Sequence, residues 1–201
     1  ELVSPRSAEP LAVPLEPDSR AVVLFTSGST STPKAVPHRH AALLWSCQNV
    51  MSAKVEAFPP GEEGGTVCFL PNFHAIGFVV NFLFNMYAGV PFSVTLDPHS
   101  TQVTPTILLS ACTDLRPRIL STVPWIIESF CDMLRKGGNS TDCLRNLHHI
   151  AFAGAQLPPR CAQVLREHGI RAAVDFGQTE LAGPVLLGEI GGDQRRMRPV
   201  P

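Results

Sequence analysis

Short apolar segments alternate along this sequence with longer segments of helical period, and this alternation is the feature that most limits the fold. The apolar segments are rich in β-branched residues, which is typical of buried strands. We expect strands at 21–25, 34–37, 66–70, 91–96, 118–122, 149–153, 171–176 and 185–188, helices at 39–55, 76–87, 101–115, 124–135, 141–146 and 158–168, and a loop at 177–184. Strands that alternate with helices form a mostly parallel sheet, so we expect an α/β fold with helices on both faces.

Length and composition favour a single domain with a substantial core. A chain of 21.7 kDa is expected to bury roughly 70% of its unfolded surface. Residues 1–19 contain four prolines and no lasting periodicity, so we expect an extended lead-in there and the α/β domain at 20–201. The sequence begins at Glu1, and only 16% of its residues are charged. We therefore expect a longer polypeptide whose remainder covers some apolar surface.

Several partners and locations are disfavoured by the same sequence. The net charge is −1 without a basic run, which argues against a nucleic-acid partner. No apolar run reaches the length of a membrane span, and the N-terminus lacks a signal-peptide pattern. The six cysteines include no C-x-x-C pair, so we expect neither a zinc site nor a disulfide framework but reduced thiols in a cytoplasmic protein.

The stretch 21–40 carries the strongest chemical signal. Strand 21–25 is followed by seven small or hydroxylated residues and then by Pro33 and Lys34. Such a loop offers backbone N–H groups, hydroxyls and one cation, which are the donors that bind a polyphosphate. The expected phosphate-binding residues are Thr26, Ser27, Gly28, Ser29, Thr30, Ser31, Thr32 and Lys34. A Ser/Thr-rich surface loop is the alternative, and G-x-x-x-x-G-K-[ST] does not fit because Pro33 replaces its second glycine.

The segment TSGSTSTPKAV resembles the phosphate loop of the adenylate-forming superfamily, [ST]-S-G-[ST]-[ST]-G-x-P-K-[AG]. This superfamily includes acyl-CoA and aryl-CoA synthetases, luciferases and the adenylation domains of nonribosomal peptide synthetases. Ser31 stands where the family has its second glycine, which makes that turn stiffer. The resemblance implies that the chain is the N-terminal, AMP-binding core of a ligase that uses ATP and Mg²⁺.

A second stretch, DFGQTE at 175–180, resembles the family's Y-G-x-T-E motif with Phe176 in place of the tyrosine. The resemblance implies that Phe176 lies against adenine, that Thr179 binds the α-phosphate and that Glu180 holds Mg²⁺. It assigns to the nucleotide site Asp175, Phe176, Gly177, Gln178 and Thr179. A glycine turn followed by a helix-capping Thr–Glu pair is the alternative.

Two further stretches resemble family segments. FAGAQLP at 152–158 matches the segment whose backbone, here at Gly154, Ala155 and Gln156, lies along the adenine and the acid. A side chain at position 154 would block the ligand. PNFHAIGF at 71–78 resembles P-x-[FY]-H-x-x-G, whose histidine, here His74, borders the acid pocket and the path of the thiol. A strand–turn–helix junction and a helix-capping histidine are the alternatives. Together the motifs imply as catalytic residues Lys34, His74, Thr179 and Glu180.

The segment around His74 also bears on the substrate. Family members that activate amino acids carry an aspartate there for the α-ammonium group, whereas residues 72–75 include no carboxylate. A buried ammonium without a partner is strongly unfavourable, so we expect an aryl, fatty or α-keto acid without a free α-amino group. The apolar candidates for the acid pocket, about half of which we expect to be core instead, are Ile76, Phe78, Val79, Val123, Trp125 and Ile126.

The implied reaction converts the acid and ATP to an acyl-adenylate and pyrophosphate and then transfers the acyl group to a thiol. We expect the phosphopantetheine of a carrier-protein domain as acceptor, as in enzymes like nonribosomal peptide synthetases. A free-standing acyl-CoA or aryl-CoA ligase, with CoA as acceptor, is the alternative. The family's C-terminal subdomain has no counterpart in 1–201, so we expect the chain alone to be inactive. A non-catalytic nucleotide-binding scaffold module is the alternative from another class.

Overall fold

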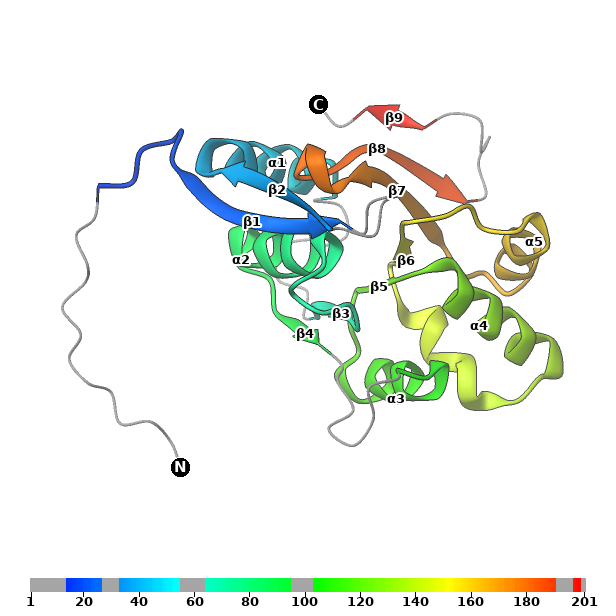
Figure 1. Ribbon diagram of the computed structural model, residues 1–201. Coiled ribbons are helices and arrows are strands. Elements are labelled where there is room, and N and C mark those ends of the chain that lie inside the picture. The colour runs from blue at the N-terminus through cyan, green and yellow to red at the C-terminus, as the bar shows by residue number, and fades with distance from the viewer. Residues whose placement is uncertain (1–13, 27–32, 55–63, 95–102, 191–196, 200–201) are drawn as a thin grey trace, which may run out of the picture.

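The computed structural model describes residues 14–26, 33–54, 64–94, 103–190 and 197–199, and at 51–54, 139 and 198 it describes the backbone alone. These residues form one seven-stranded sheet, one two-stranded sheet and the helices that cover them (Figure 1). Among the helices of these ranges, none is long and apolar enough to cross a membrane.

The seven-stranded sheet forms the centre of the fold, in the order β4-β3-β5-β6-β7-β8-β9. Its strands are β3 (Thr66–Cys68), β4 (Phe92–Val94), β5 (Ile119–Thr122), β6 (His149–Phe152), β7 (Ala172–Gln178), β8 (Gly183–Ile190) and β9 (Arg198–Pro199). Neighbours from β4 to β7 pair in parallel, whereas β8 pairs antiparallel with both β7 and β9. The mostly parallel sheet expected from the sequence is confirmed. Parallel pairing brings the carboxyl ends of β3, β5, β6 and β7 to one edge.

One layer of helices packs on the sheet through the larger hydrophobic cluster. It consists of α3 (Pro105–Leu115), α4 (Pro124–Lys136), the 3-10 helix η3 (Asn139–Asn146) and α5 (Pro159–Glu167). Proline stands in the first turn of α3, α4 and α5, where its missing N–H costs no helical hydrogen bond. The helix expected at 101–115 begins at Pro105, because the side chain of Thr104 caps it by accepting from the Ile107 N–H (3.4 Å).

A second layer packs through a smaller cluster. Its helices are α1 (His40–Lys54) and the π-helix η2 (Ile76–Leu83), which continues as α2 (Phe84–Ala88). Leu43, Val50, Val79 and Phe84 form its buried centre, together with Ala182. Figure 1 shows α1 and α2 on one side of the sheet and α4 and α5 on the other. The helices therefore cover both faces, as expected.

The two N-terminal strands form a sheet of their own. β1 (Arg20–Thr26) and β2 (Lys34–Arg39) pair antiparallel, with Thr26 opposite Lys34, and they do not join the main sheet. Only residues 27–33 connect them, which is too short for the crossover that parallel strands need, so antiparallel pairing is the natural arrangement. Leu24 packs into the smaller cluster, while Val23 and Phe25 on the other face of the hairpin are exposed.

The loop expected at 177–184 is wrong. β7 continues to Gln178, the 3-10 turn η4 (Thr179–Leu181) follows, and β8 begins at Gly183. The glycines suggested a loop, but Gly177 serves the pairing of two strands, because a Cβ there would lie 2.3 Å from the Gly183 carbonyl oxygen. β8 is accordingly longer than the strand expected at 185–188 and closes that side of the sheet as an antiparallel strand.

All six cysteines have free thiols, and all but Cys143 are buried. Burial raises the pKa of the Cys68 thiol to about 11 and that of Cys112 to about 12. Both thiols are therefore protonated at neutral pH, and a protonated thiol is neither a nucleophile nor a metal ligand.

The α3 helix offers a matched test of the core. Leu108 is fully buried in the larger cluster and Leu115, at the end of the same helix, is about half exposed. We predict that Leu108→Ala in the full-length protein lowers the free energy of unfolding by ~2–5 kcal/mol through the cavity it leaves. Leu115→Ala is expected to change it by less than ~0.5 kcal/mol. Urea denaturation measures both, and equal effects would contradict the packing of α3 described above.

Candidate functional site

A cavity of about 190 Å³ opens at the edge of the sheet where β3, β5, β6 and β7 end. Its lining comes from residues 74–76 and 80, 121–122, 151–154, 175, 177–179 and 183–184. These are the turn and helix after β3, the ends of β5, β6 and β7, and the start of β8. Ligands of open parallel sheets bind outside the carboxyl ends of the strands, so the cavity is the candidate functional site.

His74 reaches the cavity from the turn between β3 and η2. Its backbone N–H donates to the Pro71 carbonyl (2.9 Å), which closes the turn, and its own carbonyl accepts from the Phe78 N–H (2.9 Å). The Ile76 N–H donates to His74 Nδ1 (3.2 Å). Nδ1 is therefore an acceptor and Nε2 carries the proton of the neutral ring, which makes Nε2 the donor available to a ligand.

Gly77 allows the helix η2 to start directly against that turn. A Cβ at this position would lie 2.2 Å from the Pro71 carbonyl oxygen and 2.5 Å from that of Leu70. Close packing thus requires a glycine at position 77. The same close contact fixes the position of His74 relative to the cavity. The π-helical geometry of η2 is a further local feature, because π-helices often occur at functional sites.

We predict that Gly77→Ala displaces His74 as well as destabilising the fold by ~1–3 kcal/mol, because backbone atoms and not a flexible side chain occupy the space. Gly89→Ala is the matched control. Its φ of +66° makes the substitution strained, but no atom lies within 4 Å of the added Cβ. Heteronuclear NMR should show a change in the chemical shifts of the His74 ring in Gly77→Ala and no change in Gly89→Ala. An unchanged His74 signal in Gly77→Ala would contradict this role.

Asp175 and Phe176 are neighbours on β7, and their side chains point to opposite faces of the strand. Asp175 is buried, borders the cavity and is followed by Phe176, which is 48% exposed and lies outside the cavity lining. Gly177, Gln178 and Thr179 border the cavity again. Phe176, which was expected against adenine, and the Asp175 carboxylate therefore face different surroundings.

Helix α1 anchors the turn that follows this segment. The buried Ser46 Oγ donates to the Ala182 carbonyl (2.8 Å), and the Ala182 N–H donates to the carbonyl of Thr179 (3.2 Å). Ala182 is buried and adopts a φ of +56°, a left-handed conformation that costs a residue with a Cβ about 1–2 kcal/mol. These contacts hold the Thr179–Leu181 turn against the second helical layer.

Only one of the three residues expected in the segment 154–156 borders the cavity. Gly154 does so with a φ of +93°, and a Cβ added there would meet no protein atom within 4 Å. A side chain at this position would therefore be strained and would extend into open space at the cavity. Ala155 and Gln156 are exposed and lie outside the lining.

The expected phosphate loop is described only at its two ends. Ser27, Gly28, Ser29, Thr30, Ser31 and Thr32 lie outside the described residues. Thr26 and Lys34 pair at the end of the β1–β2 hairpin, and Lys34 is exposed. Neither residue lines the cavity, but both strands of the hairpin pack beside the Thr179–Leu181 turn. The hairpin and the segment 175–180 are thus neighbours in space.

Glu180, the expected Mg²⁺ ligand, is exposed on the turn η4 and lies outside the cavity lining. Within the described ranges, no three His, Cys, Asp or Glu side chains come together as a closed metal site. Mg²⁺ in nucleotide sites is typically held by one or two carboxylates and by substrate phosphates. A single accessible carboxylate next to Thr179 fits that donor set.

Of the six apolar candidates for the acid pocket, about half of which were expected to be core, one lines the cavity. Ile76 lines the cavity, whereas Val79 and Ile126 are fully buried in the two hydrophobic clusters and Phe78 packs beside one of them. Val123 is packed against the larger cluster. Helical period alone could not tell which helix positions face the cavity and which face the sheet.

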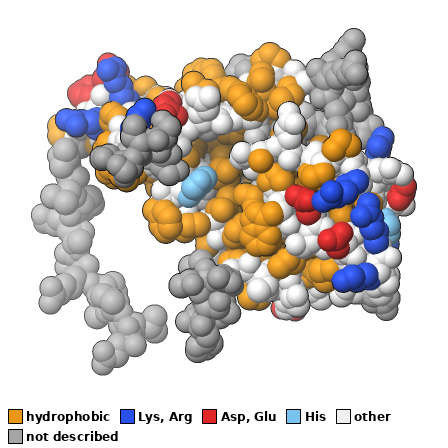
Figure 2. All heavy atoms as spheres, turned by 45° about the vertical axis from the view of Figure 1, so that its right-hand side comes forward, with side chains coloured by type: hydrophobic (Ala, Val, Ile, Leu, Met, Phe, Trp, Pro, Cys, Tyr) orange, Lys and Arg blue, Asp and Glu red, His pale blue; other side chains and the backbone are white. Residues whose placement is uncertain are grey.

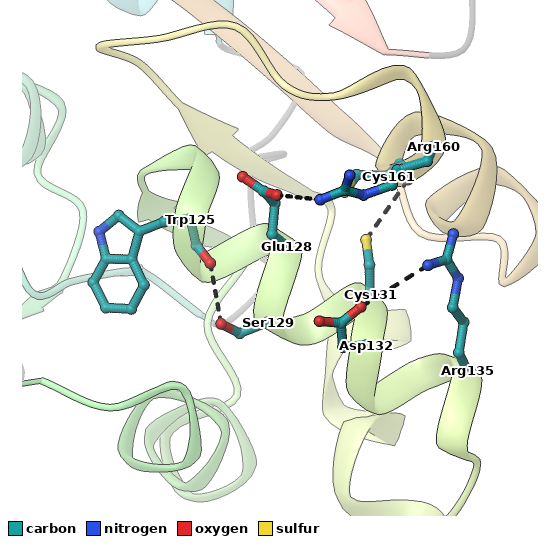
Figure 3. Close-up of polar contacts among 8 residues, drawn as sticks. All are labelled: Trp125, Glu128, Ser129, Cys131, Asp132, Arg135, Arg160 and Cys161. Carbon is teal, nitrogen blue, oxygen red and sulfur yellow. Dashed lines mark hydrogen bonds and ion pairs between the residues drawn. The ribbon is translucent and has the colours of Figure 1, made fainter.

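Trp125 also lies outside the cavity lining. It is 52% exposed and packs edge-to-face on Phe69, with ring centroids 6.4 Å apart. Figure 3 shows it projecting from the start of α4, away from the contact with α5 where Arg160 donates to Glu128 (2.7 Å). Apolar side chains occupy the middle of one face of the molecule, with charged side chains gathered beside them (Figure 2).

Sequence reasoning missed the polar residues at the end of β5. Ser121 and Thr122 are buried and line the cavity. The signal was present, because both stand at the carboxyl end of an expected parallel strand, directly before the Val123–Pro124 start of a helix. Residues 151–153 at the end of β6 also line the cavity, although within the segment 152–158 only residues 154–156 were expected at the site.

A family model described as AMP-binding enzyme matches residues 2–201 of this chain. An adenylate-forming reductase of Aspergillus terreus is 30% identical over 85% of the chain, which covers 15% of the reductase. A feruloyl-CoA synthase of an Amycolatopsis species is 30% identical over 89% of the chain, which covers 34% of the synthase. The chain thus spans about a third of one of these relatives and about a seventh of the other.

The fold also resembles solved structures. The O-succinylbenzoate coenzyme A synthetase of Bacillus subtilis, solved in complex with ATP and a magnesium ion, superposes with a TM-score of 0.75. The match covers 97% of this chain and 39% of the synthetase at 17% sequence identity, so it is a likeness of fold.

Proposed function

The chain belongs to the family of AMP-binding enzymes, and we propose that the protein containing it converts a carboxylic acid and ATP to an acyl-adenylate and pyrophosphate. The observation that carries the proposal is the cavity at the carboxyl ends of the strands. Segments recognised separately in the sequence, around His74, Gly154 and Thr179, meet there. An active site that joins two substrates needs such convergence, because its main task is to align them.

The phosphates, the adenine and the Mg²⁺ ion each have proposed protein partners. The loop 27–32 with Thr26 and Lys34 holds the phosphates, Thr179 binds the α-phosphate, and Phe176 lies against the adenine. Glu180 holds the Mg²⁺ ion, which neutralises charge on the phosphate oxygens. Formation of the acyl-adenylate needs little acid–base chemistry. The residues act by orienting the carboxylate toward the α-phosphorus and by stabilising the negative charge.

The acid is proposed to lack a free α-amino group and to be aryl, fatty or α-keto. The support is the segment 72–75, which leads to His74 without a carboxylate to pair with an α-ammonium. The name of the feruloyl-CoA synthase points to an aryl acid in one relative. The cavity volume of about 190 Å³ is below the ~300–1,000 Å³ of typical ligand pockets, which favours a small acid.

The acyl group is then proposed to pass to a thiol, past His74. We favour the phosphopantetheine of a carrier-protein domain, with CoA as the alternative acceptor. We also propose that turnover needs the remainder of the parent protein, including a C-terminal subdomain. In this proposal residues 1–19 are a lead-in and residues 20–201 are part of the AMP-binding domain. Free cysteines suit a cytoplasmic protein.

A non-catalytic scaffold is the second candidate, and the replacement of a family glycine by Ser31 favours it. The presence of Lys34, Thr179 and Glu180 argues for catalysis, since a scaffold needs none of them.

Lys34→Ala in the full-length protein is predicted to lower the rate of acyl-adenylate formation by at least ~10²-fold. The reason is the loss of a fixed charge that stabilises the phosphates. Lys136→Ala, at the exposed C-terminal end of α4, is the control and should leave the rate unchanged. Unaltered adenylate formation in Lys34→Ala would refute the proposed phosphate site.

Carboxylate-dependent ATP–pyrophosphate exchange on the full-length protein tests the substrate class. We predict exchange with members of a panel of aryl, fatty and α-keto acids and none with α-amino acids. Exchange with amino acids alone would overturn the substrate class, and no exchange at all would favour the scaffold. CoA or a phosphopantetheinylated carrier protein is then added together with the acid that supports exchange. The thiol that becomes acylated identifies the acceptor.

A further inference from the structure

Helix α1 joins two parts of the proposed nucleotide site that the main sheet does not connect. One part is the β1–β2 hairpin, whose end carries Thr26 and Lys34. The other part is the turn η4, which carries Thr179 and Glu180. The hairpin is a sheet of its own, so among the described residues no strand pairing fixes its position relative to η4. A contact of another kind has to set the separation between the two parts.

Thr26 and Lys34 point to the face of the hairpin that packs on the rest of the fold. Residues opposite each other in an antiparallel pair share a face, as do residues two apart on one strand. Thr26 lies opposite Lys34, and Leu24 on the same face is buried in the smaller cluster. Ala182, at the end of η4, belongs to that cluster too. The Lys34 side chain therefore leaves the hairpin on the face that meets η4.

The hairpin and α1 form one unit. β2 ends at Arg39 and α1 begins at the next residue, His40, and Figure 1 shows the helix lying beside the hairpin. The His40 N–H donates to the Ser19 carbonyl (3.2 Å), and the Ala41 N–H donates to the Pro17 carbonyl (2.9 Å). The first turn of α1 is thus hydrogen-bonded to the residues that lead into β1, so a residue of α1 can fix the position of the whole hairpin.

Ser46 connects this unit to the turn η4. Its side chain is buried, with the residue 1% exposed, and its Oγ donates to the Ala182 carbonyl (2.8 Å). Ala182 follows Glu180 by two residues and has a φ of +56°. A residue with a Cβ adopts this left-handed conformation at a cost, so the turn is expected to relax when the contact that holds it is removed. The two segments are close, since a Cβ at Gly183 would lie 2.8 Å from Ser46 Oγ.

We propose that Ser46 is a positioning residue for ATP, because its hydrogen bond to Ala182 sets the separation between Lys34 and the Thr179–Leu181 turn. The proposal rests on the function proposed above and adds a residue that touches neither substrate. In that function ATP bridges the two parts, with its α-phosphate at Thr179 and its outer phosphates at Lys34. AMP has the α-phosphate alone and contacts one part.

A fixed separation therefore matters for ATP and not for AMP. ATP makes both sets of contacts without a further cost only when the two parts already stand at the right distance. The residues proposed for the adenine and the α-phosphate, Phe176 and Thr179, belong to one continuous segment. A shift of this segment against the hairpin carries AMP with it but breaks the alignment that ATP needs. The acid borders His74, which comes from a different turn, so the KM for the acid does not depend on Ser46.

Nucleotide binding to the full-length protein, measured by calorimetry without the acid, tests the proposal. Ser46→Ala is expected to weaken the binding of ATP with Mg²⁺ by about tenfold, the effect of one hydrogen bond, and that of AMP by less than about twofold. In ATP–pyrophosphate exchange the KM for ATP should rise by the same factor, with the KM for the acid unchanged. Ser46→Cys keeps a weaker donor and should show a smaller change in the same direction.

Thr66→Val is the matched control. Thr66 is buried at the start of β3, at the opposite end of the strand from the cavity. Its Oγ1 donates to Asn85 Oδ1 (2.9 Å), so this variant also loses one buried hydrogen bond. We expect a comparable fall in melting temperature and an unchanged ratio of ATP affinity to AMP affinity.

The possible failures are distinguishable. Equal weakening of ATP and AMP in Ser46→Ala, or no weakening of either, would overturn the positioning role and leave the proposed function standing. The same change of ratio in Thr66→Val would also overturn it, because the ratio would then follow stability alone. If Ser46→Ala fails to fold, the ratio in Ser46→Cys decides. A wild-type protein that binds neither nucleotide would overturn both proposals, and one that binds both without exchange with any acid would contradict the proposed function alone.

Discussion

The parallel pairing of β3, β5, β6 and β7 is the constraint on which the candidate site depends. Parallel strands all end at the same edge of the sheet, so the turns that follow them meet although they are far apart in the sequence. His74, Thr122, Gly154 and Asp175 come together because of this pairing. Slippage of one strand by one residue would exchange its buried and its cavity-facing side chains, so the register of the sheet fixes the chemistry of the site.

Close backbone contacts then set the position and orientation of the residues around the cavity. Gly77 brings η2 onto the Pro71 carbonyl and Gly177 brings β7 onto Gly183, in both cases at distances that no side chain would permit. The Ser46–Ala182 hydrogen bond ties the turn after Thr179 to α1. Such a bond contributes about 0.5–1.5 kcal/mol, yet it connects the nucleotide side of the site to the second helical layer. Function therefore rests on small residues as much as on charged ones.

The sequence was sufficient for the elements and for the fold class, because apolar runs and helical periods reflect burial on a sheet covered on both faces. It was insufficient wherever long-range packing decides. The glycines of 177–184 indicated a loop and turned out to serve strand pairing, and the apolar residues Val79 and Ile126 belong to the core and not to the cavity. Ser121 and Thr122 were missed because they lie outside the segments that matched family motifs, and only the pairing of β5 within the sheet brings them to the cavity.

A crystal structure of the full-length protein with a non-hydrolysable analogue of its acyl-adenylate tests the central claim most directly. The account predicts that the acyl part occupies the cavity between His74 and Gly154, and that the adenine lies against Phe176 on the other face of β7. An acyl part bound outside this cavity, or an adenine bound within it, would contradict the account.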